Sequence, residues 1–221
     1  MIDLHTHSIF SDGELIPAEL VRRAQNKGYE GLAITDHADS SNLDWIIPRL
    51  VRFCRQLNRK NTFPVLPGIE LTHVDPESIF PLSREARKLG AEIILVHGET
   101  IVEPVSPGTN RAALEADIDI LAHPGLISEE EVLIAKKKGI HLEISSRKGH
   151  SLTNGHVAKL AKKYGVPLIL NTDAHGPDDL IDSFQARRVA LGAGLSDADW
   201  KDMRDNARKI VNKILRKQNN H

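Results

Sequence analysis

The chain has 221 residues, a formal net charge of −1 and 40% hydrophobic residues, which is enough for one large domain with a full core. The balanced charge gives no overall electrostatic footprint for nucleic acid, and the single cysteine, Cys54, excludes disulfides within the chain and sites built from several thiolates. Since no apolar run approaches the roughly 18 residues of a membrane span and the start does not resemble a signal peptide, we expect a single domain over residues 1–221 of a cytoplasmic protein.

Short apolar runs alternate along the chain with charged segments of helical spacing. The runs lie at 2–4, 31–35, 65–69, 92–96, 118–122, 141–145 and 167–171, with 189–191 as a candidate eighth. They are rich in Ile, Leu and Val and lack polar alternation, which is typical of strands buried on both faces of a parallel sheet. Glycines such as Gly90 and Gly139 stand where each helix would need a left-handed residue at its end.

So many strand–helix units without a linker or a change in composition predict an α/β fold. We expect a closed barrel of parallel strands with outer helices rather than an open sheet. The segment 38–60 is expected to be a helix after a loop, and the Pro-rich segment 99–109 a loop without clear structure. Residues 197–219, approximately, are expected to form a terminal helix with a solvated basic face.

Histidines and carboxylates collect where the predicted strands end. In chain order these residues are His5, His7, Asp36, His37, Glu70, His97, His123, Asp173 and His175, with Asp12 in the loop after the first strand. The carboxyl ends of the strands of a parallel barrel share one face, where the catalytic residues of barrel enzymes gather. Residues far apart in the chain are therefore expected to form one ring.

The residue types in this ring point to metal ions. Neutral imidazole and carboxylate suit zinc, manganese or iron, and about nine such ligands exceed the needs of one ion, so we expect two to three divalent ions. Three ions would bring six positive charges against the three negative charges of Asp12, Glu70 and Asp173. The surplus would attract a multiply charged anion such as a phosphate ester, and water on such ions ionises near neutral pH to give a hydroxide nucleophile.

With these residues assembled, the sequence resembles the PHP family, named for polymerase and histidinol phosphatase domains. The resemblance runs from residue 3 to about 180 and rests on the motifs HTH at 5–7, SDG at 11–13, TDH at 35–37, GIE at 68–70, VHG at 96–98, AHP at 122–124 and TDAH at 172–175. It implies a distorted (β/α)7 barrel and three ion sites. The sites implied are His5, His7, Glu70 and Asp173; Glu70, His97 and His123; and Asp12, His37 and His175.

Other residues near these motifs are candidates for further roles. Asp36 would orient a ligand histidine or bind an ion directly, and His73 would act as a general acid or be a solvated loop histidine. The stretch after the sixth strand carries three residues that would contact a substrate phosphate or else form an ordinary basic loop: Arg147, Lys148 and His150. Glu143 is a candidate buried partner for one of these cations.

The resemblance favours a phosphoesterase that hydrolyses a small phosphate ester by attack of a metal-bound hydroxide, with a histidinol-phosphatase-like monoesterase preferred. A phosphodiesterase or nuclease of the same family, or a non-catalytic scaffold like the ribonuclease P protein, is the alternative. The complete ligand set argues for catalysis, and the neutral charge argues against a nucleic-acid partner. An amidohydrolase-type enzyme fits less well because no predicted strand ends in the lysine ligand typical of that class. Metal, substrate and oligomeric state stay open.

Overall fold

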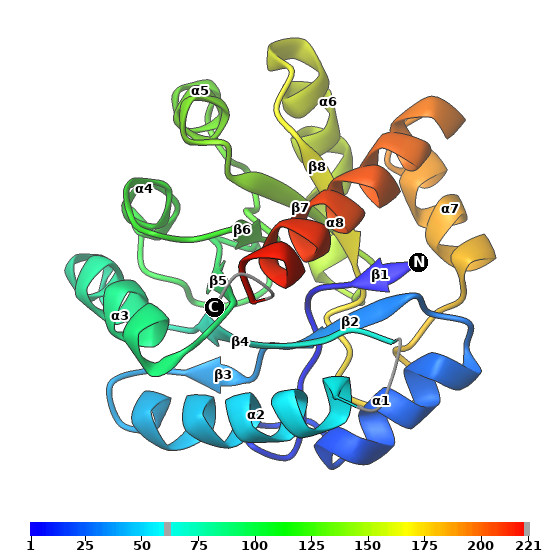
Figure 1. Cartoon of the computed structure of the whole chain (residues 1–221). Coiled ribbons are helices and arrows are strands. Elements are labelled where there is room, and N and C mark those ends of the chain that lie inside the picture. Colours follow the sequence, from blue (N-terminus) through cyan, green and yellow to red (C-terminus); the bar gives the residue numbers. More distant parts are fainter. Residues whose placement is uncertain (60–62, 219–221) are drawn as a thin grey trace.

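A sheet of parallel strands curls into a nearly closed barrel in the computed structural model, which describes residues 1–59 and 63–218 (Figure 1). The strands are β1 (Ile2–Asp3), β2 (Gly31–Ile34), β3 (His37–Ala38), β4 (Val65–Leu71), β5 (Ile93–His97), β6 (Ile120–Ala122), β7 (His141–Ser145) and β8 (Leu168–Asn171). Their order in the sheet is β1-β2-β4-β5-β6-β7-β8, with β3 also paired to β4. The predicted distorted (β/α)7 barrel is confirmed.

Strands β2 and β3 occupy one position in the barrel. Ile34 of β2 pairs with Pro67, and His37 of β3 pairs with Glu70, so both keep the same register on β4. Between them the backbone N–H of Thr35 donates to the carbonyl of Thr6 at 2.8 Å, on the side of β1. The eight short strands therefore make seven barrel positions.

The barrel closes where the chain after β1 meets the chain after β8. Thr6 forms a parallel bridge with Ala174, and the N–H of His7 donates to the Ala174 carbonyl at 2.8 Å. On the other side of the bridge, the N–H of Asp173 donates to the carbonyl of His5 at 2.9 Å. This closure places the first and last of the predicted ligands next to each other.

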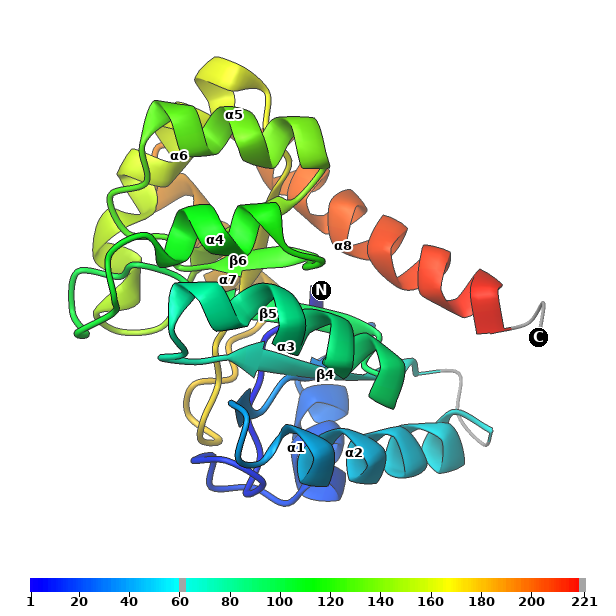
Figure 2. The same cartoon turned by 90° about the vertical axis from the view of Figure 1, so that its left-hand side faces the viewer.

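Helices surround the sheet as expected for alternating strand–helix units (Figures 1 and 2). They are α1 (Pro17–Asn26), α2 (Leu43–Asn58), α3 (Pro76–Leu89), α4 (Thr109–Glu115), α5 (Glu129–Lys138), the 3-10 turn η1 (His150–Thr153), α6 (Asn154–Tyr164), α7 (Ser183–Gly192) and α8 (Asp197–Gln218). Gly90 and Gly139 take the left-handed conformation at helix ends, with φ of 105° and 71°. No helix in the described ranges is both long and apolar enough to cross a membrane.

The interior of the barrel is apolar and is covered at one end by α8. Side chains from every barrel position except β7 pack with two buried residues of α8: Ile2, Leu4, Ala33, Leu66, Ile93, Leu95, Ile120, Ala122, Ile169, Ala207 and Val211. In Figure 1 this helix lies across the end of the barrel at which β1 begins. The carboxyl ends of the strands are left free for a site.

One element predicted from the sequence is absent from the described structure, and two predicted helices are present. The candidate eighth strand at 189–191 is wrong, because these residues lie in α7, where the fully buried Ala186 and Ala190 are one helical turn apart and the Asp182 carboxylate accepts from Gln185 N–H at 2.7 Å. The predicted helices at 38–60 and 197–219 are confirmed as α2 and α8, while residues 60 and 219 lie outside the described residues.

Candidate metal centre

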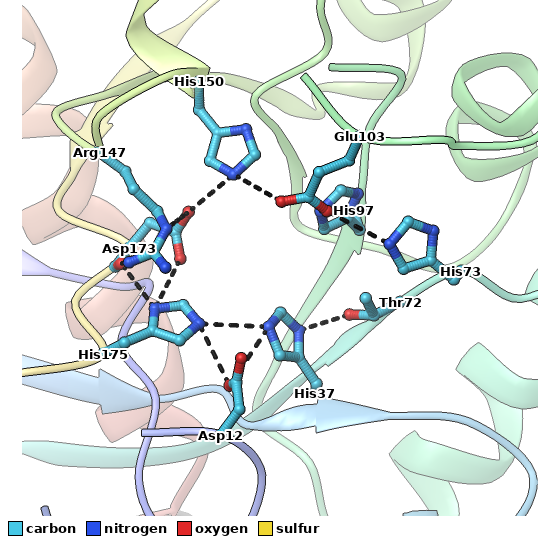
Figure 3. Close-up of a pocket in the computed structure, with 10 residues that line it drawn as sticks. All are labelled: Asp12, His37, Thr72, His73, His97, Glu103, Arg147, His150, Asp173 and His175. Atoms are coloured by element: carbon cyan, nitrogen blue, oxygen red, sulfur yellow. Dashed lines mark hydrogen bonds and ion pairs between the residues drawn. The ribbon is translucent and has the colours of Figure 1, made fainter. Parts of the chain in front are cut away.

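The predicted ligands meet at the carboxyl ends of the strands, around a cavity of about 200 Å³ (Figure 3). The cavity is lined by Asp12, His37, Thr72, His73, His97, Glu103, Arg147, His150, Asp173 and His175. His5, His7, Glu70 and His123 lie buried near it and are in contact with Asp173 or with one another. All nine expected ligands therefore belong to one cluster of side chains.

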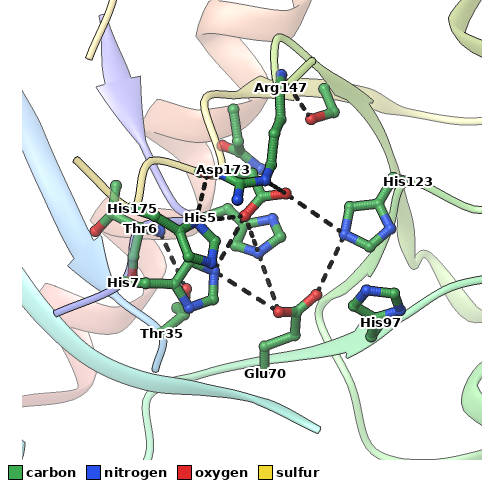
Figure 4. Close-up of polar contacts among 12 residues, drawn as sticks. His5, Thr6, His7, Thr35, Glu70, His97, His123, Arg147, Asp173 and His175 are labelled. Atoms are coloured by element: carbon green, nitrogen blue, oxygen red, sulfur yellow. Dashed lines mark hydrogen bonds and ion pairs between the residues drawn. The ribbon is translucent and has the colours of Figure 1, made fainter. Parts of the chain in front are cut away.

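The first group lies deepest and joins the chain segment after β1 to β4 and to the segment after β8 (Figure 4). His5 Nε2 is 3.3 Å from Glu70 Oε2 and 3.5 Å from Asp173 Oδ1. His7 Nε2 is 3.2 Å from the same Asp173 oxygen. These are the four residues that the family resemblance assigns to one ion.

The second group lies on the other side of Glu70. His123 Nε2 is 3.5 Å from Glu70 Oε1, whereas both N-terminal histidines face Oε2. His97, His123 and His150 each offer one nitrogen within 4.8 Å of the others. Glu70 thus separates two groups with its two oxygens, as a bridging carboxylate does, and His150 lies with the potential ligands as well as at the cavity wall.

The third group is the most exposed. Asp12 Oδ1 is 3.2 Å from His175 Nε2 and 3.5 Å from His37 Nε2. His7 completes this group, with ligand atoms of all four residues within 4.8 Å of one another. The three residues expected for a third ion therefore lie together, and His7 stands between this group and the first.

The buried atoms of these groups fit divalent cations. Among the described residues, seven of their buried nitrogens and oxygens have no hydrogen-bond partner: His5 Nε2, His7 Nδ1 and Nε2, Glu70 Oε1, His97 Nδ1, His123 Nδ1 and Asp173 Oδ1. A buried polar atom left unpaired costs about 1–3 kcal/mol, so seven such atoms in one place indicate that a ligand binds there. The donor set of imidazole and carboxylate is that of zinc, manganese or iron.

The protonation states of His7 and Glu70 favour metal binding, whereas at His5 and His37 nearby carboxylates outweigh burial and raise the pKa above its usual value. Burial, helped by the nearby His37 and His5, lowers the pKa of His7 well below its usual value, so the ring is neutral. Burial opposes the ionisation of Glu70, but His5 and His37 outweigh it and hold the pKa of this carboxyl well below its usual range. Neutral imidazole and ionised carboxylate are the forms that bind metal.

Glu143 orients two of the ligands. Its Oε1 is 2.8 Å from His5 Nδ1 and accepts from Asn171 Nδ2 at 2.8 Å, and its Oε2 accepts the His123 backbone N–H at 3.0 Å. The expectation that it pairs with a cation of the loop after β7 is wrong. As part of a buried strand it points inward to His5, where a carboxylate fixes the ring and its tautomer.

The two candidate catalytic residues differ in position. Asp36 accepts from Ser8 N–H at 2.7 Å, Ser8 Oγ at 2.7 Å and Ser11 Oγ at 2.9 Å, so it holds the loop between His7 and Asp12. These bonds give Asp36 an orienting role for this loop, not for a ligand histidine as expected, and they disfavour direct ligation. His73 lines the cavity mouth and is 42% exposed.

Backbone strain is concentrated in the site. His73, His123 and Asp173 have φ of 52°, 25° and 54°, and within the described ranges they are the non-glycine residues with positive φ. Such conformations cost of the order of 1–3 kcal/mol each and cluster at functional sites, where surrounding contacts enforce them.

Of the expected phosphate contacts, Arg147 faces the cavity and Lys148 does not. Arg147 Nη1 donates to the Asp173 carbonyl at 3.1 Å and lies 3.6 Å from Asp179 Oδ2, which fixes the guanidinium at the wall. Lys148 is exposed and is absent from the cavity lining. The structure therefore brings Arg147 and His150, but not Lys148, to the site.

Sequence reasoning missed two residues of the cavity lining: Thr72, whose Oγ1 lies 2.6 Å from His37 Nδ1, and Glu103. Glu103 Oε2 is 3.0 Å from His97 Nε2, and Glu103 Oε1 is 3.4 Å from His150 Nε2. Glu103 belongs to the Pro-rich loop between β5 and α4, which has neither a strand end nor a helical period. No signal in the sequence marks this glutamate among the other charged residues.

The family resemblance is confirmed by comparison with known proteins. The family model described as "PHP domain" matches residues 3–186, so the chain belongs to the PHP family.

Similar sequences carry different names. An uncharacterized protein of Methanocaldococcus jannaschii is 49% identical over 202 residues, covering 90% of this chain and 93% of that protein. Ribonuclease P protein component 3 of Methanosarcina barkeri is 29% identical, covering 88% and 81%. A probable phosphatase of Clostridium botulinum is 31% identical, covering 79% of each.

Two solved structures share the fold. A chain in archaeal ribonuclease P with mature tRNA superposes with a TM-score of 0.71 at 20% identity, covering 97% of this chain and 91% of its own. Histidinol phosphate phosphatase of Lactococcus lactis, complexed with zinc, L-histidinol and phosphate, has a TM-score of 0.57 at 19% identity, covering 88% and 94%. With relatives of both kinds, the expectation that nucleic acid is not a partner has no support from the comparisons.

Proposed function

We propose that this protein is a metal-dependent phosphoesterase that hydrolyses a small phosphate ester. A phosphomonoesterase similar to histidinol phosphatase is favoured. The observation that carries the proposal is the set of buried, unpartnered imidazole and carboxylate atoms in three adjoining groups that share Glu70 and His7. The probable phosphatase of Clostridium botulinum, at 31% identity, supports the same class.

Each group of side chains would hold one divalent ion, giving two to three ions in all. His5, His7, Glu70 and Asp173 would hold the first; Glu70, His97 and His123, with His150 nearby, the second; and Asp12, His37 and His175 the third. Divalent ions in such positions lower the pKa of bound water and offset charge on a phosphate. The protein's part is to fix their positions, which Glu143 does for His5 and Asp36 does for the loop carrying Asp12.

The cavity wall would select the substrate. Arg147 offers a planar fork that can hold two phosphate oxygens, and its contacts with Asp173 and Asp179 set its direction before binding. A cavity of about 200 Å³ admits a phosphate and part of a small leaving group. As long as its imidazole holds no ion, His73 at the mouth would donate a proton to the leaving oxygen.

A ribonuclease P-type role is the second candidate, because one relative of that name is 29% identical and one fold match has a TM-score of 0.71. The complete ligand set favours catalysis on a small ester, since a scaffold has no need of it.

The deciding experiment uses the metal-stripped protein, reloaded with Zn²⁺, Mn²⁺ or Fe²⁺ separately. A panel of phosphomonoesters, phosphodiesters and a labelled tRNA precursor is then offered to each form. We expect turnover of small monoesters, histidinol phosphate among them, only after reloading. Tight tRNA binding without hydrolysis of any ester under any metal would overturn the proposal in favour of the scaffold role.

Changing Arg147 to alanine is expected to reduce kcat/KM for a phosphomonoester by about 30- to 1000-fold, or about 2–4 kcal/mol, the range of lost anion donors. Lys148→Ala is the matched control: it removes a neighbouring positive charge that faces solvent, and we expect almost no change. Metal content, measured by elemental analysis, should be the same in both variants. Equal kcat/KM for Arg147→Ala and the parent would show that this guanidinium does not bind substrate.

A further inference from the structure

Beside the three groups, a fourth set of side chains meets at the mouth of the cavity (Figure 3). His73, after β4, His97, at the end of β5, and Glu103, from the loop before α4, each offer a ligand atom within 4.8 Å of the other two. Glu103 Oε2 lies 3.0 Å from His97 Nε2 and 3.3 Å from His73 Nε2. We call this set the rim trio. Neither the strand-end pattern nor the family motifs include His73 or Glu103.

We propose that the rim trio binds an additional divalent cation, more weakly than the buried groups do. His97 is shared with the second group: its Nε2 faces Glu103, and its buried Nδ1 has no hydrogen-bond partner among the described residues, so the ring would bind one ion at each nitrogen as an imidazolate. Two imidazoles and one carboxylate match the ligand preferences of Zn²⁺ and Mn²⁺ and leave positions open for water or an anion. Weaker binding follows from exposure: His73 and Glu103 are 42% and 38% exposed, whereas His97 is 3% exposed. Water competes for ligands at this site more than it does at Glu70, which is fully buried.

The trio is held in place before any ion arrives. The Glu99 carboxylate accepts N–H groups of Gly108 and Asn110 at 3.0 and 2.9 Å and so ties together both ends of the loop that carries Glu103. Thr100 Oγ1 is 2.8 Å from His150 Nδ1, which fixes the same loop to η1. Preorganised ligands lower the entropic cost of binding.

His73 adds a second sign of preorganisation. Its φ of 52° is left-handed, a conformation that is uncommon outside glycine and that costs of the order of 1–3 kcal/mol. In Figure 3 the trio lies across the cavity from Arg147. A cation there and the guanidinium would face a bound anion from two sides, a consequence that rests on the proposed function, whereas the cation site itself does not.

The test is a calorimetric titration of the metal-stripped full chain with ZnCl₂. Elemental analysis after gel filtration then counts the tightly bound ions. Glu103→Gln removes the only carboxylate of the trio, and His73→Asn removes an imidazole while keeping a residue that tolerates left-handed φ. Glu77→Gln, an exposed glutamate on α3, is the matched control. Circular dichroism spectra show whether each variant keeps the fold.

We expect the parent and Glu77→Gln to bind one weak equivalent more than either trio variant, whose weakest site should lose at least tenfold in affinity. The double variant should lose no more than a single one, because each change removes the same ion. Identical isotherms for the parent and both trio variants would overturn the proposal. So would loss of a tight equivalent in Glu103→Gln, since this glutamate would then belong to the buried centre.

The same titration distinguishes failure of the rim trio from failure of the proposed function. A parent protein that keeps its tight equivalents but has no weak one refutes the rim trio alone. A parent that binds no ion in the titration refutes the metal-dependent phosphoesterase together with it.

Discussion

Glu70→Gln is expected to lower phosphomonoester turnover by about a thousandfold or more, which corresponds to roughly 4 kcal/mol in the barrier. Glu70 Oε2 lies 3.3 Å from His5 Nε2 and 2.8 Å from His37 Nδ1, and Oε1 lies 3.5 Å from His123 Nε2. Two ions bridged by this carboxylate would be about 3.5–4 Å apart. Without its negative charge, their repulsion should eject one of them, which elemental analysis detects together with the loss of kcat.

The fold should survive this change, because glutamine has nearly the same shape and β4 keeps its backbone pairing with β3 and β5. Glu143→Gln provides the graded comparison. This residue orients His5 and His123 without facing the ions, so we expect a smaller loss, about 10- to 100-fold in metal affinity or activity. Near-normal metal content and turnover in Glu70→Gln would contradict the bridging position.

Removal of metal is expected to lower the melting temperature by roughly 8–16 °C. An ion present at about 1,000 times its dissociation constant stabilises the folded state by about 4 kcal/mol, and a chain of this size shifts by about 2–4 °C per kcal/mol. The physical source is the set of seven buried atoms without a hydrogen-bond partner among the described residues, several of which would become ligands of a bound ion. Differential scanning calorimetry of the chelated protein, before and after ZnCl₂ is restored, measures the difference.

Glu70→Gln is again the control for this measurement, because a protein that has lost one ion should gain less from added zinc than the parent. If the chelated and reloaded proteins melt at the same temperature, the buried groups do not hold ions in the folded state. This outcome is independent of any choice of substrate.

The sequence was most informative where one pattern repeats. Each barrel position is one strand–helix unit, and the end of each strand is easy to locate in the sequence. The ligands from His5 to His175 could therefore be predicted in chain order. A barrel brings strand ends to one face whatever their separation in sequence. For the same reason the sequence alone predicts that these residues converge, and the structure adds the distances between them.

The sequence was least informative for side-chain direction and irregular loops. Glu103 lies in a segment without period, and only the ties of Glu99 to Gly108 and Asn110 bring it to the cavity. Glu143 was assigned the wrong partner because its strand pairs it inward with His5, across 138 residues of sequence. The run at 189–191 suits a strand by composition, but the spacing of Ala186 and Ala190 suits a helix better.

The way in which the barrel closes has a consequence for how the protein is made. During synthesis β1 precedes the other strands, and it can pair with β2 once Gly31, the partner of Ile2, has been made. Its other edge must wait for Ala174, and the barrel interior must wait for Ala207 and Val211. Contacts at such separation are slow to form, because the intervening chain must first be ordered. The histidines of a nascent chain therefore stay unassembled until the segment with Ala174, Ala207 and Val211 has been made, and metal insertion is expected to follow the synthesis of this domain rather than to guide it.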